Sequence, residues 1–564
     1  MTSFSSGKPE FRTLKLALLI AGAISPLAAS AADSPLRGNP AESLPPVSVP
    51  VPAAAPSVSV PAPAQNEAIQ ALLAHRLVPK QFDVSGVTAI DFQKVIDLLE
   101  PLAGKEITVA ELIQRTDAIT QLYRDAGYAL SFALIQSQDF RDGLVKVTVV
   151  EGYVGSTRIE GDAGNAAAKI RDYAARIEAE RPLTRATLER YLNLMTTVAG
   201  ATIKPELALP KRADGSTELV VNVGYKAFRL DTGIGNLGTG VHAMLTATAN
   251  SLTPLAEQIQ VTTAVPRGSD HLEYYAANVA VPVGSDGMTV RAEAYSYAAN
   301  PENDSLNAQN IDRRVRNQRA GLSVSYPFLL ANRESLTGTA GFYASRNNDT
   351  YSSRITGNQV TLSNHLRVLR GELAYAQATD RQSRRITAAI YKGMDGLGAE
   401  QSANSSYDLG FTRYTLMANQ NFTLPHQFGL SLAALGQYSA DSLPTSEQVT
   451  FGGQRFGRGY PAGELGGDKG YGASIELNRR FGVGLPYLQS VTPYVLADYA
   501  HVKLNNKNFT LATDTLTSLA LGLRVTDQRH YAFDLNLAKP VGDKPVNSSG
   551  RPLRLNANYS LRFD

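Results

Sequence analysis

The residues with the clearest chemical potential lie in the glycine-rich stretch FGGQRFGRGYPAGELGGDKGYGASIELNRRF, residues 451–481. At its centre, Arg458 lies between Gly457 and Gly459 and is followed by Tyr460. A guanidinium is planar, permanently charged and suited to a carboxylate partner, and flanking glycines allow a sharp turn close to a surface. The pattern predicts a loop folded against a wall of the protein. The alternative is an ordinary solvated loop arginine.

A carboxylate partner for Arg458 is predicted in PYVLADYAHV, residues 493–502. Alternation places Asp498 on the same face of a strand as the apolar Leu496 and Ala500. A carboxylate that faced lipid would be costly. We therefore expect Asp498 to face the interior of the protein and to pair with Arg458.

The other motifs argue against cofactors and catalysis. GIGNLGTG has the G-x-G-x-x-G spacing of a dinucleotide site, but a strand-like segment follows where that site needs a helix. The sequence also lacks a G-x-x-x-x-G-K-[ST] motif, an H-E-x-x-H motif, a G-x-S-x-G motif and any cysteine. His501, one of seven histidines, is expected to be a lumen or interface residue. The sequence predicts no enzyme, no cofactor, no metal site and no nucleotide partner.

The element that must position Arg458 and Asp498 is predicted over residues 228–564, where short alternating segments follow one another. LRLNANYSLRF at the end of the chain places leucines, Tyr559 and Phe563 on one face and arginines and asparagines on the other. Such alternation suits a transmembrane barrel with lipid outside and water inside, and backbone pairing in lipid requires the sheet to close. At roughly 20 residues per strand with its connections, about 16 antiparallel strands are expected, and 14 or 18 also fit. A secreted, soluble β-rich protein is the alternative.

Two similar units precede the barrel, over residues 77–153 and 154–227. Each has a β-α-α-β-β pattern, with Thr108 and Thr184 at the starts of corresponding helices. A passive pore would not need such units, so they favour a barrel that handles another protein.

The N-terminus predicts export. Basic residues precede the apolar run LALLIAGAISPLAA, which indicates a signal peptide over residues 1–31 with cleavage near Ala31. The proline-rich segment 32–65 is expected to be a linker, and residues 66–76 a short helix that is either a plug or a linker. The 54 basic and 51 acidic residues are too balanced to suggest a nucleic-acid partner.

FGRGY and the GELGGDKGYGASIELNRRF that follows it resemble the lid loop and adjoining strand of the two-partner secretion transporters (TpsB type), which secrete haemolysins and filamentous haemagglutinins. YRDAGY at 123–128 and VVEG at 149–152 resemble the first POTRA domain of that family. Gly457 replaces a valine of the family's lid motif, and Leu496 and Ala500 depart from its F-x-D-x-G strand motif.

The resemblance implies two periplasmic POTRA domains and a 16-stranded barrel in the outer membrane of a Gram-negative bacterium, surrounded by lipid. It implies a lid loop near 451–470, in which Arg458 contacts Asp498 on the barrel wall. The lid motif comprises Phe456, Gly457, Arg458, Gly459 and Tyr460.

The implied partner is a large unfolded exoprotein of the adhesin or haemolysin type, which the POTRA domains capture and the barrel translocates. Strand addition to an exposed sheet edge is the expected mode of capture. The candidate edge comprises Ser131, Phe132, Ala133, Leu134 and Ile135. An insertase of outer-membrane proteins and a passive porin are the alternatives. The sequence leaves open the identity and release of the client and the oligomeric state.

Overall fold

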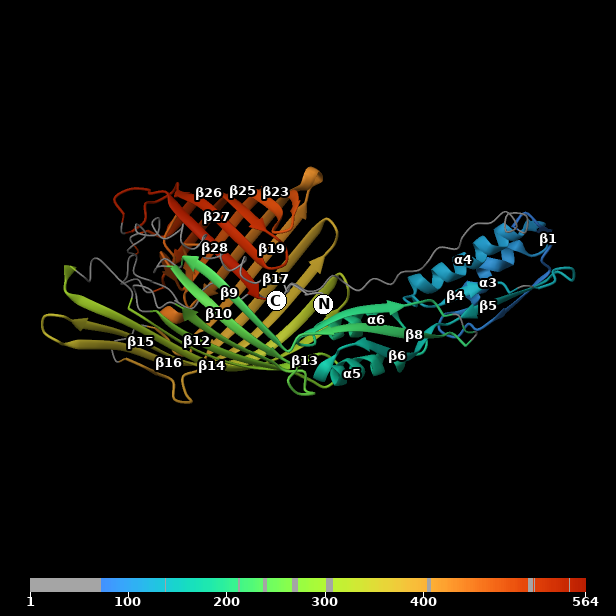
Figure 1. The fold of residues 1–564 in the computed structure, drawn as a ribbon, viewed down its shortest axis with the longest axis horizontal. Helices are drawn as coiled ribbons and strands as arrows, with labels where there is room; N and C mark the ends of the chain where they lie inside the picture. The colour runs from blue at the N-terminus through green and yellow to red at the C-terminus, as the bar shows by residue number, and fades with distance from the viewer. Residues whose placement is uncertain are drawn as a thin grey trace, which may run out of the picture.

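The computed structural model describes residues 73–563 except 137, 211, 213, 237–240, 266–271, 301–307, 403–406, 506–510, 512 and 547. The predicted signal peptide and linker lie outside these residues, as does most of the helix expected over 66–76. Arg76, at the end of that expected helix, belongs to strand β1 (Arg76–Leu77). Two small α+β units lead into a large closed sheet (Figure 1).

The first unit has the predicted β-α-α-β-β order. Its elements are β2 (Gln81–Ser85), α3 (Phe92–Leu99), η3 (Glu100–Leu102), β3 (Ile107–Thr108), α4 (Val109–Asp125), β4 (Phe132–Leu134) and β5 (Leu144–Val150). Strand β5 lies in the centre of the sheet, parallel to β2 and antiparallel to β4. Helix α4 begins at Thr108, which forms a capping box with Glu111, and buries Leu112 and Ile119 against the sheet.

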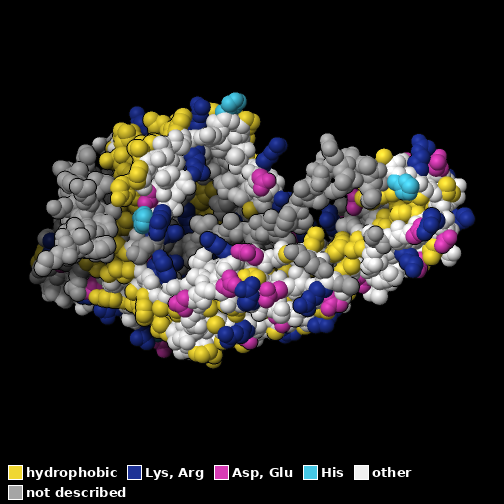
Figure 2. Space-filling view, turned by 45° about the vertical axis from the view of Figure 1, so that its right-hand side comes forward, with side chains coloured by type: hydrophobic (Ala, Val, Ile, Leu, Met, Phe, Trp, Pro, Cys, Tyr) yellow, Lys and Arg dark blue, Asp and Glu magenta, His cyan; other side chains and the backbone are white. Residues whose placement is uncertain are grey.

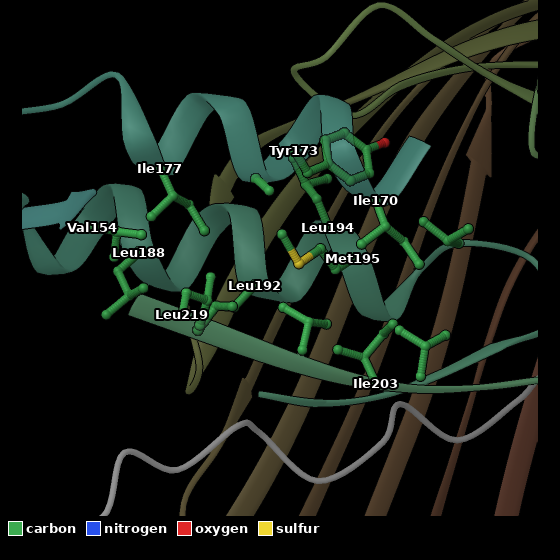
Figure 3. Packing of buried hydrophobic residues seen from close by; sticks show 14 of the residues in the cluster. Val154, Ile170, Tyr173, Ile177, Leu188, Leu192, Leu194, Met195, Ile203 and Leu219 are labelled. Carbon is green, nitrogen blue, oxygen red and sulfur yellow. The ribbon is translucent and has the colours of Figure 1, made fainter. Parts of the chain in front are cut away.

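The second unit repeats this arrangement. Its elements are β6 (Tyr153–Gly161), η4 (Gly164–Ala166), α5 (Ala167–Glu178), α6 (Arg185–Thr196), β7 (Ala201–Leu207) and β8 (Ser216–Tyr225). The strand order is β6-β8-β7, and Thr184 caps α6 as Thr108 caps α4. Figure 3 shows Ile177 of α5, Leu188 and Leu192 of α6 and Leu219 of β8 packed in one core.

The remaining chain forms a closed antiparallel barrel. The closed sheet contains 18 strand segments. β18 (Glu400–Gln401) continues β17 along β16, and β24 (Phe481–Leu485) continues β23 along β25. The barrel wall therefore has 16 strands, which we call staves. The predicted barrel of about 16 strands is confirmed. The staves are β9 (Phe228–Asn236), β10 (Val241–Asn250), β11 (Gln258–Val265), β12 (Glu273–Val283), β13 (Met288–Ala299), β14 (Ile311–Leu330), β15 (Glu334–Ser353), β16 (Gln359–Ala378), β17 (Gln382–Gly393), β19 (Thr412–Thr423), β20 (Phe428–Ser439), β23 (Lys469–Arg479), β25 (Leu488–Lys503), β26 (Thr515–Thr526), β27 (Tyr531–Pro540) and β28 (Arg554–Phe563).

Side chains alternate between the two faces of this sheet as the sequence predicts. On β26, Leu519 and Leu521 are 53% and 61% exposed on the outside, whereas Ser518 and Ala520 face inward and are buried. Hydrophobic side chains cover much of the outer surface, and Lys and Arg are visible in the hollow that the sheet encloses (Figure 2). Among the described residues, no helix combines the length and the apolar character needed to cross a membrane.

The second unit is docked on one end of the barrel, which we call the proximal end. Arg190 of α6 donates from its guanidinium to the carbonyl oxygens of Pro327, at 2.9 Å, and Asp286, at 2.8 Å. The Tyr191 hydroxyl donates to the Asp286 carboxylate at 2.8 Å. These contacts fix α6 against the turn after β12 and the end of β14. The opposite, distal end lies away from both units (Figure 1).

Strands β14, β15 and β16 have 20 residues each and reach far beyond the other strands at the distal end (Figure 1). Because about 9 to 11 residues cross a bilayer, roughly half of each strand lies outside it.

Candidate functional site

The glycine-rich stretch lies in a long connection between β20 and β23, residues 440–468, that folds into the barrel; we call it the inner loop. It contains η6 (Thr445–Glu447) and a short hairpin formed by β21 (Val449–Phe451) and β22 (Leu465–Gly467). Apolar side chains fasten it to the inner face of the wall. The loop contributes Val449, Phe451, Phe456, Tyr460 and Leu465 to a cluster with Leu435, Ala500, Val502 and Leu516 of the strands.

The tip of the inner loop is a tight turn that requires glycine. Gly457 has a φ of +92°, a conformation that residues with a side chain rarely adopt, and the Tyr460 amide donates to its carbonyl at 2.9 Å. A Cβ on Gly459 would lie 2.5 Å from the backbone nitrogen of Pro540. Both glycines flanking Arg458 are therefore explained by the close approach of the tip to the barrel wall.

Arg458 contacts Asp498 through its backbone. The Arg458 amide donates to Asp498 Oδ2 at 3.0 Å, and the Ser518 hydroxyl donates to Oδ1. Asp498 projects inward from β25 and is only 4% exposed, so these neutral donors satisfy a buried carboxylate.

The expected ion pair between the Arg458 guanidinium and Asp498 is not formed among the described residues; the guanidinium reaches past the carboxylate. It donates from Nη1 to the Tyr494 hydroxyl at 2.9 Å, and its carbon lies 5.7 Å from the centre of the Tyr494 ring. The physical reason is the pair of flanking glycines. Because they carry no side chains, the Arg458 amide comes close enough to Asp498 to donate the hydrogen bond that was expected from the guanidinium.

Tyr494 connects Arg458 to an acidic network on the wall. The Tyr494 hydroxyl donates to Asp534 at 2.6 Å. Arg524 donates to Asp534 at 2.8 Å and to Glu476 at 2.6 and 2.7 Å. The tip thus rests on side chains from β23, β25, β26 and β27.

The other residues of the predicted lid motif are also buried against the wall. Tyr460 is fully buried, and its hydroxyl donates to the carbonyl of Asp543 at 2.7 Å. Phe456 packs edge to face on Phe451, with the ring centres 5.9 Å apart. All five motif residues, from Phe456 to Tyr460, lie in one contact region with Asp498.

A second anchor of the inner loop, Glu447, was missed by the sequence analysis. Its side chain has no exposed surface and lies 3.2 Å from Arg319 Nη2 and 2.7 Å from Arg413 Nη2. The Tyr343 hydroxyl lies 2.9 Å from both carboxylate oxygens. These partners come from β14, β15 and β19, on a different part of the wall from Asp498, so the loop is fastened on two sides of the lumen.

Tyrosine rings hold the two arginines that contact Glu447. The Arg319 guanidinium lies 3.9 Å from the centre of the Tyr343 ring, and that of Arg413 lies 3.7 Å from the Tyr391 ring. The inward parity of these arginines is visible in the sequence. Their common partner is not, because Glu447 meets them only through loop folding.

The C-terminal end of the inner loop has its own anchor. Asp468 is 1% exposed and accepts hydrogen bonds from the amides of Leu443, at 2.8 Å, and Asn505, at 2.7 Å. Asp468 therefore joins both ends of the loop to the distal end of β25.

The predicted client-binding edge lies on β4, which pairs with β5 alone among the described strands. Its outward backbone is less open than expected. The Ser131 amide donates to the Tyr128 carbonyl at 3.2 Å, and the Ala133 amide donates to the Thr120 hydroxyl at 3.0 Å. The amides of two of the five predicted edge residues, Ser131 and Ala133, therefore already have acceptors within the first unit.

Comparison with known proteins gives two family matches. Residues 215–525, more than half of the chain, match the model described as "Haemolysin secretion/activation protein ShlB/FhaC/HecB". Residues 77–152 match the model of the ShlB-type POTRA domain.

Individual relatives agree with these matches. The "Heme/hemopexin transporter protein HuxB" of Haemophilus influenzae is 22% identical over 474 residues, 80% of this chain and 81% of the relative. The "Outer membrane transporter CdiB" of Escherichia coli is 23% identical over 463 residues, 78% of this chain and 75% of the relative. The solved structure of CdiB from E. coli superimposes with a TM-score of 0.69 at 19% identity, covering 89% of this chain and 93% of that one.

Proposed function

The chain belongs to the ShlB/FhaC/HecB family of haemolysin secretion/activation proteins, and from this premise we propose that its inner loop is the lid that controls passage of a client protein. The protein is an outer-membrane transporter of two-partner secretion with its POTRA domains in the periplasm. The proximal end of the barrel therefore faces the periplasm, and the distal end faces the cell exterior.

The observation that carries the proposal is the attachment of one loop to two parts of the lumen wall. The Asp498 contact holds the tip against β25, and Glu447 holds the start of the loop against β14, β15 and β19. A chain passing through the lumen must displace at least one of these contacts. The tip is the part that moves in this proposal, because its contact to Asp498 is made by neutral donors, whereas Glu447 is held by two cations.

The proposed client is a large, unfolded exoprotein of the adhesin or haemolysin type. Support comes from relatives named as transporters of hemolysin and of heme/hemopexin, and from the paired POTRA domains. We further propose that the client pairs with an open sheet edge of a POTRA domain. No enzymatic activity, cofactor, metal, nucleotide or nucleic-acid partner is part of this proposal.

The proposed domain division follows the sequence expectation: a signal peptide over 1–31, a linker over 32–65, a plug or linker helix over 66–76, POTRA domains over 77–153 and 154–227, and the barrel over 228–564. Amino-terminal sequencing of the protein purified from outer membranes tests the first boundary. A mature chain that begins near residue 32 supports it, and a chain that retains the basic N-terminus contradicts it.

Quantitative proteomics of culture medium and outer membrane, with this protein present and absent, tests the function. Loss of one large secreted or surface protein is the expected result and identifies the client. A broad fall in outer-membrane barrels would favour an insertase instead, and an unchanged protein composition would favour a passive pore.

A further inference from the structure

Two lysines face each other on the outer surface of the barrel at its extracellular end. Lys469 begins β23, Lys503 ends β25, and the two are directly opposite in the antiparallel register. Both share the parity of exposed, outward-facing residues such as Tyr471, Ile475 and Val495. The pair therefore projects from the wall toward the membrane rather than into the lumen.

This arrangement is unfavourable unless an anion is present. Like charges directly opposite on neighbouring strands destabilise a sheet. Neither lysine forms an ion pair with a described residue, and the Lys469 ammonium instead lies 5.7 Å from the centre of the Tyr438 ring. Asp514, just before β26, is directed to His501, with 3.9 Å between its carboxylate and the imidazole Nδ1. Among the residues that the structure describes, no ion pair offsets the repulsion between the two lysines.

A groove of about 490 Å³ lies beside the lysine pair. Gly436 lies in its floor with the outward parity of Leu432 and Tyr438 on the same strand, and it carries no side chain to fill the groove. Tyr414, Tyr438 and Tyr471 stand along it and are each half exposed. The groove is rimmed by aromatic rings that suit a membrane interface.

The groove continues into the lipid-facing band of the barrel. Leu416 lies in its lining next to Tyr414 and is 54% exposed, and Ile475 and Val495 on the neighbouring strands are 50% exposed. A ligand in the groove therefore meets two ammonium groups at the extracellular interface and hydrocarbon-compatible surface below them. That combination fits an amphiphile with an anionic head group.

We propose that Lys469 and Lys503 bind the phosphate of a phosphorylated lipid in the outer leaflet of the outer membrane. Ammonium groups bind phosphate as point charges, and one phosphate between the two lysines replaces their repulsion with two attractions. A soluble phosphate or an acidic segment of the client would gain nothing from the exposed apolar surface below the pair. The site adjoins Asp468, so the lipid occupies the outside of the wall where the inner loop leaves it.

Thermal unfolding of the purified full-length protein in a zwitterionic detergent tests the proposal. The lysine pair is expected to lower the unfolding temperature without the anionic lipid and to raise it when the lipid is bound. Without anionic lipid, Lys503→Gln is expected to unfold at a higher temperature than the wild type, because the repulsion is removed. Diphosphorylated lipid A is expected to raise the unfolding temperature of the wild type and to leave that of Lys469→Gln/Lys503→Gln unchanged. Dephosphorylated lipid A is expected to stabilise neither protein.

The matched control is Lys392→Gln/Lys539→Gln, which removes two exposed lysines from the extracellular ends of β17 and β27 and changes the net charge equally. This control is expected to respond to lipid A as the wild type does. Equal stabilisation of the wild type and the lysine-pair variant would overturn the proposal. Equal stabilisation by inorganic phosphate would overturn the assignment to a lipid.

Native mass spectrometry of the wild type with equal amounts of the two lipids keeps the test decisive if a variant fails to fold. Preferential retention of the phosphorylated lipid supports the site, and equal retention contradicts it.

Discussion

At the scale of single residues, Arg458 makes different contacts through its backbone and through its side chain. Its amide binds Asp498, and its guanidinium binds Tyr494 above the Arg524, Asp534 and Glu476 network. Sequence analysis identified both Arg458 and Asp498 but assigned the contact to the charged side chain. The expected and observed contacts differ because of the exact position of the Arg458 amide beside Gly457, which residue types alone do not encode.

Arg458→Ala is expected to insert and fold but to secrete poorly, because the tip loses its contact to Tyr494. Asp498→Ala is expected to loosen the tip further, since it leaves the Arg458 amide and the Ser518 hydroxyl without their acceptor, at about 1 to 3 kcal/mol for a buried group. Protease sensitivity of the inner loop and secretion of the client are measured for both variants, and the larger effect is expected for Asp498→Ala. Arg455→Ala, at an exposed arginine of the same loop, is the control. Normal secretion by Arg458→Ala would refute the role of the tip.

Glu447→Gln is expected to open the pore more than either tip variant. Breaking a buried pair typically costs about 3 to 5 kcal/mol, and less where lumen water screens the charges, because Arg319 and Arg413 keep their charge. Single-channel conductance in planar bilayers measures the opening. The double variant Glu447→Gln/Arg413→Gln also removes one of the two arginines that lost their carboxylate partner, and it is expected to recover part of the closed state. An unchanged conductance in Glu447→Gln would show that the tip alone closes the lumen.

Glu151, in the first POTRA domain, gives this domain a pH dependence. Burial alone would raise the pKa of its carboxyl, but hydrogen bonds from Thr88, Tyr123 and the Ala89 amide outweigh burial and hold the pKa below its ordinary value. A lowered folded-state pKa stabilises the fold above the unfolded-state pKa, and this stabilisation is lost as the pH falls through the folded value. Hydrogen exchange at Thr88 and Ala89 is expected to be slower in the wild type than in Glu151→Gln at pH 7. The two proteins should converge as the pH falls through the folded-state pKa of Glu151, below the ordinary glutamate value; a constant difference would contradict this account.

At the scale of elements, alternation and repeats predicted most of the fold. The alternating residues of β28 and the capping threonines of α4 and α6 have direct local causes, so one sequence suffices to place them. Glu447 and its two arginines are separated by 128 and 34 positions in the chain, and no local pattern connects them. The same limit applies to β4, whose edge position was expected but whose amides are used by Tyr128 and Thr120.

Thr120→Val tests whether β4 captures the client. The valine keeps the shape of the buried threonine but frees the Ala133 amide, which costs about 1 to 3 kcal/mol until another carbonyl accepts its hydrogen bond. If the client adds to β4, the variant is expected to bind it more tightly, because the client supplies that carbonyl. Interferometry measures how tightly Thr120→Val binds the client's N-terminal region. Thr116→Val is a buried control on the same helix. Weaker or equal binding would place capture on another edge.

At the scale of the whole molecule, the second POTRA domain forms a continuous body with the barrel. Arg190 and Tyr191 fasten α6 to the periplasmic turns, and Leu194 lies so close to Gly287 that a Cβ there would be 2.5 Å away. Movement during transport is therefore expected in the inner loop and the first POTRA domain rather than at this junction.

A cross-link tests that rigidity. The chain contains no cysteine, so Tyr191→Cys/Asp286→Cys introduces a single reactive pair without further changes. A short bismaleimide joining the two residues is expected to leave secretion intact, because the junction does not open. The unlinked double variant controls for the loss of the native hydrogen bond. Secretion that stops only after cross-linking would show that the domain must detach.

The long strands β14 to β16 have a consequence for how the protein evolves. Their outer halves, which include Arg313 paired with Asp349 at 2.7 Å, stand beyond the bilayer as a rigid sheet that antibodies and bacteriophages can reach. Near the middle of two of these strands lie Arg319 and Tyr343, which hold Glu447. Host immunity and phage attack thus favour change at the outer ends of these strands, while lid closure resists change near the middle of β14 and β15. Strain-to-strain variation is expected to rise abruptly along a single β-strand.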